Sequence, residues 1–233
     1  MLDSRLKRND SLRMKTAVKI LPLLIFAFVL VIFAGCKTLC SKPDSVDLFN
    51  GKDFSGWTFC MRSNSDPMLT WSVENGLMHC TGQPYGYART TKIYHDYKLT
   101  VIWRFIKVAP HADNSGIFVH IQPPDKVFPE CVECQGQYQH QGDIILGRGA
   151  SADGHPSNPQ KSTVVRQMYP QNEFPAGEWG TNVVICSGST IQLYVNGKMM
   201  NKVTGCNISS GFVGIQSEGG DVEVRRILLE PLK

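Results

Sequence analysis

Hydrophobic and polar side chains alternate along much of this chain, most regularly over residues 97–105. Tyr97 opens a series of apolar residues at every second position there, and Lys98 opens a mostly polar series between them. Successive side chains of a β-strand point to opposite faces, so this period of two predicts a strand with one buried face. Further segments of strand character are residues 116–121, 131–138, 182–186, 212–216 and 222–227. The pattern therefore predicts an all-β fold.

Asparagine and glycine mark the turns between these segments. Asn75-Gly76 and Asn196-Gly197 are typical of two-residue hairpin turns, which need a positive φ at both positions. Residues 142–175 break the alternation and are rich in Gly, Ser, Asp, Pro and Asn, which predicts one long loop. Many short strands joined by turns favour a β-sandwich of two antiparallel sheets.

The first 35 residues have the pattern of a signal peptide. Six of the chain's 24 basic residues lie within residues 1–19, and residues 20–33 carry no charge. This uncharged run of 14 residues is shorter than the ~20 needed to span a bilayer, which disfavours the alternative of a retained anchor. Met14 opens a more typical signal and is an alternative start. We therefore expect a leader over residues 1–35, a tether over 36–47 and one domain over 48–233.

The end of the leader, Phe33-Ala34-Gly35-Cys36, resembles the lipobox of bacterial lipoproteins. This resemblance implies lipidation of Cys36 and a location in the cell envelope, either periplasm or outer membrane. The membrane is then a partner only through that lipid. Without the leader, the chain keeps 18 basic and 18 acidic residues, because the leader holds six of the 24 and two of the 20. A neutral domain gives no support for nucleic acid as a partner and favours a neutral oligosaccharide.

Seven cysteines remain after Cys36, and an exported protein can pair them in disulfides whose connectivity the spacing does not give. Cys131 and Cys134 have the Cys-x-x-Cys spacing of some metal and redox sites. In a strand their side chains point to opposite faces, and no second pair follows at ligand spacing. We therefore predict no metal site and no cofactor, although a divalent metal that assists catalysis stays an open alternative.

Short motifs in a fixed order give the chain a family resemblance. They are Leu48-Phe49-Asn50-Gly51-Lys52-Asp53-Phe54-Ser55-Gly56-Trp57, Trp71-Ser72-Val73-Glu74-Asn75-Gly76, Asn114-Ser115-Gly116-Ile117, Glu178-Trp179, Val195-Asn196-Gly197, Gly214-Ile215-Gln216-Ser217-Glu218-Gly219 and Val222-Glu223-Val224-Arg225-Arg226-Ile227. Together they resemble the DUF1080 family, also called 3-keto-disaccharide hydrolase domains, over nearly the whole chain after the leader.

The resemblance implies a concanavalin A-like jelly roll, with two curved antiparallel sheets and a carbohydrate-binding concave face. It also implies cleavage of glycosides whose sugar carries a ketone at C3, and an upstream sugar 3-dehydrogenase that supplies this substrate. A C3 ketone acidifies the hydrogen at C2, so a base can remove it and the glycosidic oxygen at C1 can leave. Such chemistry needs a base, a donor to the enolate oxygen and an acid for the leaving group.

Glu133 is the first candidate for the base, in a Glu-x-Gln pattern similar to that of the family. Alternation places Glu133 and Gln135 on one face of a strand with Cys131, and Val132 and Cys134 on the other. Gln135 is therefore a candidate substrate-binding residue. The alternative for Glu133 is an ordinary solvated glutamate on a strand.

Two further candidates come from strand alternation. Arg104 projects from the polar face of its strand and is expected to bind substrate or the enolate oxygen, unless it simply covers the sheet. His120 is expected to share a face with Phe118, opposite Ile117 and Val119, and is a candidate acid. A satisfied structural histidine is the alternative.

The remaining candidates lie at turns and in motifs. His140 and Asp143 open the predicted long loop, as a substrate-binding residue and as a second catalytic carboxylate, unless Asp143 is a turn residue. Glu218 lies in a family motif and is a candidate for substrate binding. Asn114 is another, with a turn as its alternative role.

Two other functions compete with 3-keto-glycoside cleavage. A two-carboxylate glycosidase on this fold would carry Glu-x-Asp-x-x-Glu on one strand, with its two carboxyl groups ~5 Å apart, and the chain has no such motif. A non-catalytic carbohydrate-binding module is compatible with the same fold.

Overall fold

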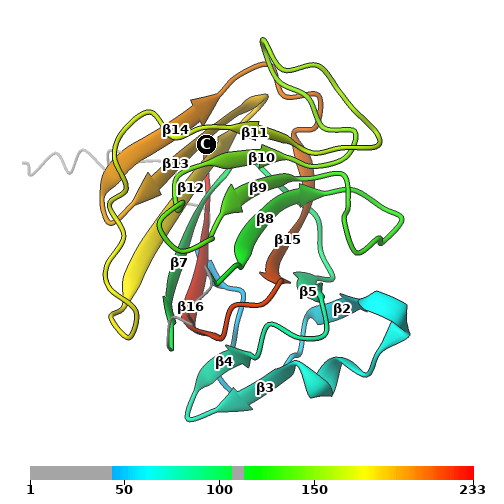
Figure 1. Cartoon of the computed structure of the whole chain (residues 1–233), viewed down its shortest axis with the longest axis vertical. Coiled ribbons are helices and arrows are strands. Elements are labelled where there is room, and N and C mark those ends of the chain that lie inside the picture. The colour runs from blue at the N-terminus through cyan, green and yellow to red at the C-terminus, as the bar shows by residue number, and fades with distance from the viewer. Residues whose placement is uncertain (1–43, 107–112) are drawn as a thin grey trace, which may run out of the picture. The chain divides into compact units, whose positions relative to one another are not determined.

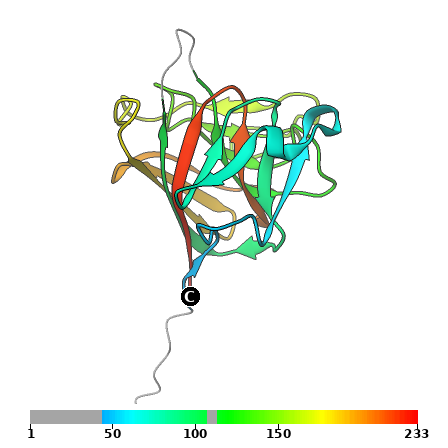
Figure 2. The ribbon, with the colours of Figure 1, turned by 90° about the horizontal axis from the view of Figure 1, so that it is seen from below.

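The computed structural model describes residues 44–106 and 113–233, all within one compact unit, Ser41–Lys233. The predicted leader, most of the tether and Cys36 lie outside the described residues. The described residues form two antiparallel β-sheets that pack face to face, one layer in front of the other in Figure 1 and again separate in Figure 2. The predicted all-β fold of two antiparallel sheets is confirmed.

The first sheet has the strand order β14-β13-β12-β7-β16-β4-β3, with β1 beside β16. Its strands are β1 (Val46–Asp47), β3 (Trp71–Glu74), β4 (Leu77–Cys80), β7 (Tyr97–Phe105), β12 (Gly180–Ser187), β13 (Thr190–Val195), β14 (Lys198–Val203) and β16 (Val222–Pro231). Every second residue of β7 is buried, as its alternation predicts. The predicted Asn-Gly turns are present in β3–β4 and β13–β14, since all four residues have φ between 47° and 81°.

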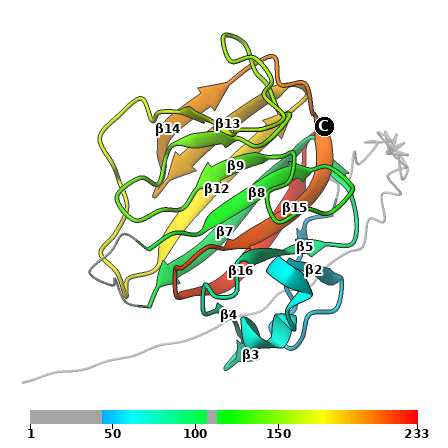
Figure 3. The same ribbon diagram turned by 45° about the vertical axis from the view of Figure 1, so that its right-hand side comes forward.

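The second sheet has the order β11-β10-β9-β8-β15-β5-β2, with β6 beside β15. Its strands are β2 (Trp57–Met61), β5 (Gly86–Thr90), β6 (Tyr94–His95), β8 (Gly116–Ile121), β9 (Val132–Gln135), β10 (Ile144–Leu146), β11 (Thr163–Val165) and β15 (Ser210–Ser217). Two short 3₁₀ helices, η1 (Arg62–Asn64) and η2 (Pro67–Leu69), connect β2 to β3 (Figure 3). Among the described residues, no helix is long and apolar enough to cross a membrane.

The main hydrophobic core lies between the two sheets. Trp103 and Leu99 enter it from the first sheet, and Val119 and Ile215 enter it from the second. Each large side chain that is fully removed from water stabilises the fold by about 1.5–3 kcal/mol, so this core holds the layers together. A second, smaller cluster contains Phe118 and lies on the other face of the second sheet, which we call the outer face.

The prediction of one long loop over residues 142–175 is wrong. Two short strands, β10 and β11, extend the second sheet within that segment. All three residues of β10 are buried, so this strand has no polar face and shows no alternation. A three-residue apolar run among loop residues is too short to be identified by its period.

Candidate functional site

The outer face of the second sheet carries Glu133. In β9, Val132 and Cys134 belong to the core between the sheets, whereas Cys131 belongs to the cluster on the outer face. Glu133 pairs with Phe118 of β8 on one side and with Ile145 of β10 on the other. The predicted division of β9 into two faces is therefore confirmed, and it also separates Cys131 from Cys134.

Glu133 is a buried carboxyl group, with 8% of the residue exposed. Its Oε1 is buried and has no hydrogen-bond partner among the described residues. Burial, with a smaller contribution from the negative charge of Glu218, raises the pKa of Glu133 to about 8. The alternative of a solvated surface glutamate is therefore wrong.

Gly116 gives this carboxyl group its space. A Cβ built on Gly116 would lie 2.5 Å from Oε1 of Glu133, so the carboxyl group occupies the volume that a side chain would fill. Gly116 pairs with Gln135, and the pairing of Ile117 with Ile215 sets Gly116 beside Gln216 in β15. The carboxyl group of Glu133 therefore extends across β8 toward β15.

Three polar side chains on the β15 side form a hydrogen-bonded group. Oε2 of Glu218 accepts hydrogen bonds from Nδ2 of Asn114 (2.7 Å) and from Nε2 of Gln216 (2.8 Å). Because both amides turn their NH₂ groups to the carboxylate, their oxygens point elsewhere. These two oxygens, Oδ1 of Asn114 and Oε1 of Gln216, are buried and have no hydrogen-bond partner in the part of the chain that the structure describes. We call Glu133, Asn114, Gln216 and Glu218 the acceptor cluster.

A cation and an aromatic ring accompany the acceptor cluster. Burial raises the pKa of Glu218, whereas the hydrogen bond from Gln216 and the positive charge of Arg62 lower it. Arg62 begins η1, and its guanidinium lies 5.1 Å from the ring centre of Tyr85. The site thus offers three unpartnered acceptor oxygens, a carboxyl group that ionises above neutral pH, and one guanidinium. Unsatisfied buried acceptors are costly, so the cluster is suited to a ligand rich in O–H donors.

The predicted position of His120 on the outer face is wrong. Phe118 of β8 pairs with Gly214 of β15, and Ile121 pairs with Phe212. β8 therefore advances by three residues where β15 advances by two, and this extra residue is a β-bulge in β8. His120 has φ of 55° in this bulge and turns toward the core, where its ring packs 5.9 Å from that of Tyr97. Burial lowers the pKa of His120 to about 4. The alternative of a structural histidine fits this position.

Arg104 lies on the other sheet. Its neighbours Trp103 and Phe105 point into the core, so Arg104 points away from the core on the opposite side of the sandwich from the acceptor cluster. It forms an ion pair with Glu223 at 2.7 Å and stacks on Trp179 at 4.4 Å. The structure does not bring Arg104 to Glu133, and the alternative of an arginine covering the sheet describes its position.

Asp143 and Gln135 lie beside Glu133 but already have partners. The backbone N–H of Gln135 donates to the carbonyl of Asp143 (3.0 Å), and Oε1 of Gln135 accepts from two backbone N–H groups of the turn that follows. The buried carboxylate of Asp143 accepts from Arg166 at 2.7 Å and from the backbone of Gln167 at 2.8 Å. Nδ1 of His140 lies 3.9 Å from Oδ2 of Asp143. These contacts connect the ends of β9 and β10 to the residues that follow β11.

Sequence reasoning missed Gln216, Gly116 and Arg62. One sequence signal could have identified Gln216. The apolar residues Val213 and Ile215 alternate with Gly214, Gln216 and Glu218, which indicates a strand with one polar face. No sequence signal connects Arg62 with β15. Over residues 44–106 and 113–233, no group of three or more His, Cys, Asp or Glu side chains is placed to hold a metal ion. The six cysteines in those ranges are free thiols.

Comparison with solved structures supports the fold. A Parabacteroides distasonis protein whose description suggests a glycosyl hydrolase superposes with a TM-score of 0.59 at 20% identity, over 81% of this chain and 94% of that one. A Bacillus licheniformis β-glucanase gives 0.54 at 14% identity, over 81% and 98% of the two chains. The carbohydrate-binding module CBM66 of Bacillus subtilis gives 0.54 at 9% identity, over 74% and 93%. All three share the jelly-roll sandwich with this chain.

Comparison by sequence identifies the family. No curated protein sequence matches this chain. A sequence model described as the 3-keto-alpha-glucoside-1,2-lyase-like domain matches residues 44–230, which cover both sheets and the whole acceptor cluster. The chain therefore belongs to the family of 3-keto-alpha-glucoside-1,2-lyase-like domains.

Proposed function

We propose that this protein cleaves 3-keto-glycosides, with Glu133 as the base that removes the hydrogen at C2. The observation that carries the proposal is the carboxyl group of Glu133, which is buried over Gly116 with Oε1 unpartnered. A desolvated carboxylate is a stronger base than a solvated one, and its pKa of about 8 is suited to a proton transfer near neutral pH.

The reaction balances without an oxidant or reductant. The proton at C2 passes to Glu133, and its electron pair forms an enolate with the C3 ketone. When the enolate collapses, the C3 carbonyl forms again, a C1–C2 double bond forms, and the bond from C1 to the glycosidic oxygen breaks. The departing oxygen takes up the proton that Glu133 removed, which returns Glu133 to its ionised form. Addition of water across C1–C2 then gives the free 3-keto sugar.

The acceptor cluster supports a sugar as the ligand. Oδ1 of Asn114 and Oε1 of Gln216 are held by Glu218 as acceptors, and sugar hydroxyl groups are the donors that would satisfy them. Arg62, the cation whose charge acts on Glu218, is the candidate donor to the enolate oxygen. Neither role requires the participation of Arg104 or His120.

One structural observation favours a second candidate function. Glu133 and Glu218 come from different parts of the chain, yet their charges interact, so the site contains two carboxyl groups. Two carboxyl groups are the machinery of ordinary glycosidases. Burial raises the pKa of both groups, however, and an ordinary retaining mechanism needs one of them ionised as the nucleophile. The 3-keto reaction needs only one base.

The variant Glu133→Gln tests the proposal. It keeps the shape of the side chain and removes the base, so we expect turnover of a 3-keto-disaccharide to fall by roughly 10²–10⁴-fold. Binding of the same disaccharide, measured by isothermal titration calorimetry, should change little. Arg104→Gln on the opposite face is the matched control and should keep full turnover.

The outcomes separate the candidates. Unchanged turnover in Glu133→Gln would contradict the role of Glu133. Turnover of the unoxidised disaccharide by the wild-type protein at the rate of its 3-keto form would favour the two-carboxylate glycosidase. Binding of glycans without turnover of either substrate would favour a carbohydrate-binding module.

A further inference from the structure

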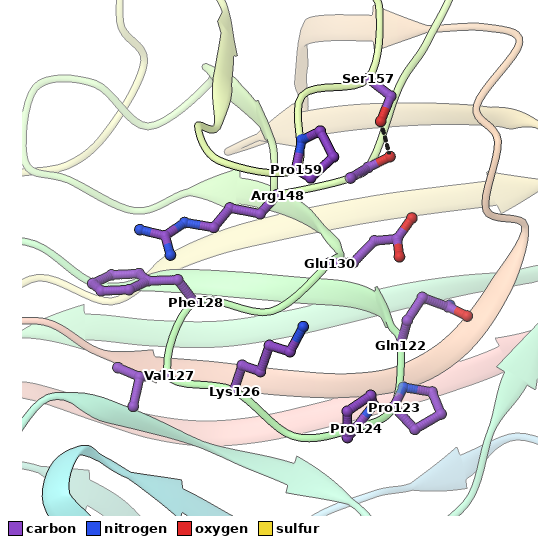
Figure 4. Close-up of a pocket in the computed structure, with 11 residues that line it drawn as sticks. Gln122, Pro123, Pro124, Lys126, Val127, Phe128, Glu130, Arg148, Ser157 and Pro159 are labelled. Atoms are coloured by element: carbon purple, nitrogen blue, oxygen red, sulfur yellow. Dashed lines mark hydrogen bonds between the residues drawn. The ribbon is translucent and has the colours of Figure 1, made fainter.

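We propose that the protein has a second ligand site, for a sugar that carries one negative charge, in a pocket between the β8–β9 and β10–β11 loops (Figure 4). This pocket has a volume of about 570 Å³, within the range of small-molecule sites. Its lining includes Gln122, Lys126, Phe128, Glu130, Arg148 and Ser157. The proposal is independent of the function proposed for Glu133.

Hydrogen bonds hold the β8–β9 loop in place. The backbone N–H of Gln122 donates to the carbonyl of Glu130 at 2.9 Å, which closes the loop at its base. At the tip, both carboxylate oxygens of Asp125 accept from Arg89 at 2.7 Å, and Oδ1 also accepts from the hydroxyl of Tyr87. This wall of the pocket is therefore formed before any ligand binds.

The β10–β11 loop is fixed in a similar way. Asn207 accepts from the backbone N–H of Ser151 at 2.7 Å and donates to the carbonyl of Gly149 at 3.1 Å. The hydroxyl of Ser157 donates to the same carbonyl at 2.7 Å, the bond drawn in Figure 4. Because both loops are already fixed, less conformational entropy is lost when a ligand binds between them.

The pocket has an excess of positive charge. Lys126 and Arg148 come from different loops, and neither forms an ion pair with another residue in the part of the chain that the structure describes. Asp125 is adjacent to Lys126 but is bound to Arg89. Glu130 is the remaining acid in the lining, with one long hydrogen bond of 3.4 Å from Asn207. Two cations and one carboxylate leave room for one negative charge on a ligand.

The orientation of Arg148 suits a planar anion. Its guanidinium lies 5.1 Å from the ring centre of Phe128, so one face of the guanidinium packs on the ring. The N–H groups at the edge of the guanidinium remain available to a ligand. A carboxylate accepts two parallel hydrogen bonds from such an edge. In Figure 4, the ammonium group of Lys126 also points into the pocket. Each of the two cations is thus available to an anionic group on a ligand.

The rest of the lining suits a sugar ring. Glu130 and the hydroxyl oxygen of Ser157 are acceptors for ligand hydroxyl groups, while Pro123, Pro124 and Pro159 provide rigid apolar walls. A purely apolar ligand would leave these polar groups unsatisfied. The chemistry common to all of these contacts is a monoanionic sugar, whose charge is a carboxylate or a sulfate ester.

The pocket is separate from the acceptor cluster. Glu130 precedes Glu133 by three residues, which is about 10 Å along an extended chain. Cys131 and Phe118 pack together on the outer face between the two sites.

Isothermal titration calorimetry of the protein with glucuronate, glucose 6-sulfate and glucose tests the proposal. We expect at least one of the two anions to bind and glucose to bind at least 10-fold more weakly. Lys126→Ala and Arg148→Ala should each weaken binding of the anion about 10-fold, and added salt should weaken it too. Lys92→Ala, an exposed lysine outside this pocket, is the matched control and should bind as the wild type does.

The comparison of ligands identifies the source of the charge. Preference for glucuronate assigns the site to carboxylate sugars, and preference for glucose 6-sulfate assigns it to sulfate esters. Equal binding of glucose, no binding of either anion, or full binding by Arg148→Ala would overturn the proposal. Glu133→Gln should keep this binding, and its loss in that variant would place the anion at the acceptor cluster instead.

Discussion

At the scale of single residues, the ionisation of Glu133 couples the site to the stability of the fold. Burial raises the pKa of Glu133 from 4.5 to about 8 in the folded protein. The folded state therefore binds more protons than the unfolded state between these pH values, and the free energy of unfolding falls as pH rises through this window. The cost of an ionised Glu133 is thus largest at alkaline pH.

The variant Glu133→Gln has no such cost. We expect the wild-type protein to lose on the order of 4 kcal/mol of stability through this group between pH 5 and pH 9, since each pH unit between the two pKa values contributes about 1.4 kcal/mol. Urea denaturation of both proteins at the two pH values measures the difference. Glu133→Gln should be the more stable protein at pH 9, and parallel pH profiles would contradict a buried, protonated Glu133.

Gly116 offers a second test at the same scale. The new Cβ of Gly116→Ala would overlap the carboxyl group of Glu133, which must then move. A displacement of about 1 Å at a catalytic group can lower turnover roughly 100-fold, so we expect such a loss of turnover with the fold retained. Gly180→Ala in β12 of the other sheet, where the added Cβ meets nothing closer than 3.4 Å, is the control. Full turnover in Gly116→Ala would argue against the observed position of the carboxyl group.

At the scale of elements, the bulge in β8 decides which residues reach the outer face. Residues before His120 follow the alternation of the sequence, and the bulge reverses it from His120 onward. Gly211 in β15 makes this possible, because a Cβ at that position would overlap the backbone of His120. A strand with a side chain there would not allow His120 to turn into the core.

Gly211→Ala should therefore be strongly destabilising. The overlap is with backbone atoms, so the strands must separate, and we expect a loss of about 2–4 kcal/mol in the free energy of unfolding. Ser209→Ala, an exposed position two residues earlier, should change stability by less than about 0.5 kcal/mol. Thermal denaturation of the two variants gives the comparison, and equal melting temperatures would show that the bulge does not depend on Gly211.

The sequence predicts a strand where the alternation of apolar and polar residues is long enough to be recognised, and a turn where a characteristic residue pair marks it. The nine residues of β7 and the Asn-Gly turns meet this condition, and both are confirmed. The three residues of β10 do not, because a strand buried on both faces has no alternation. A single residue with positive φ, such as His120, moves its own side chain and those that follow to the other face of the strand. The amino-acid composition of the strand does not signal this change. Such local events are fixed by packing between strands.

At the scale of the whole described unit, the acceptor cluster is built from segments far apart in the chain. Asn114, Glu133 and Glu218 were predicted one by one from motifs, yet only the pairing of β9, β8 and β15 places them together. Arg104 was predicted by the same reasoning and lies across the sandwich, because β7 belongs to the other sheet. Sequence patterns indicate which face of a strand a residue occupies. They do not indicate which sheet that strand joins.

The most direct test of the proposed C2 proton transfer is cleavage of a 3-keto-disaccharide in D₂O. Removal of the C2 hydrogen followed by addition of water across C1–C2 should give a 3-keto sugar with one deuterium at C2, as measured by mass spectrometry and NMR. Incubation with Glu133→Gln controls for spontaneous exchange, and the unoxidised disaccharide should remain intact. Cleavage of the 3-keto substrate without deuterium at C2, or equal cleavage of the unoxidised disaccharide, would contradict the account.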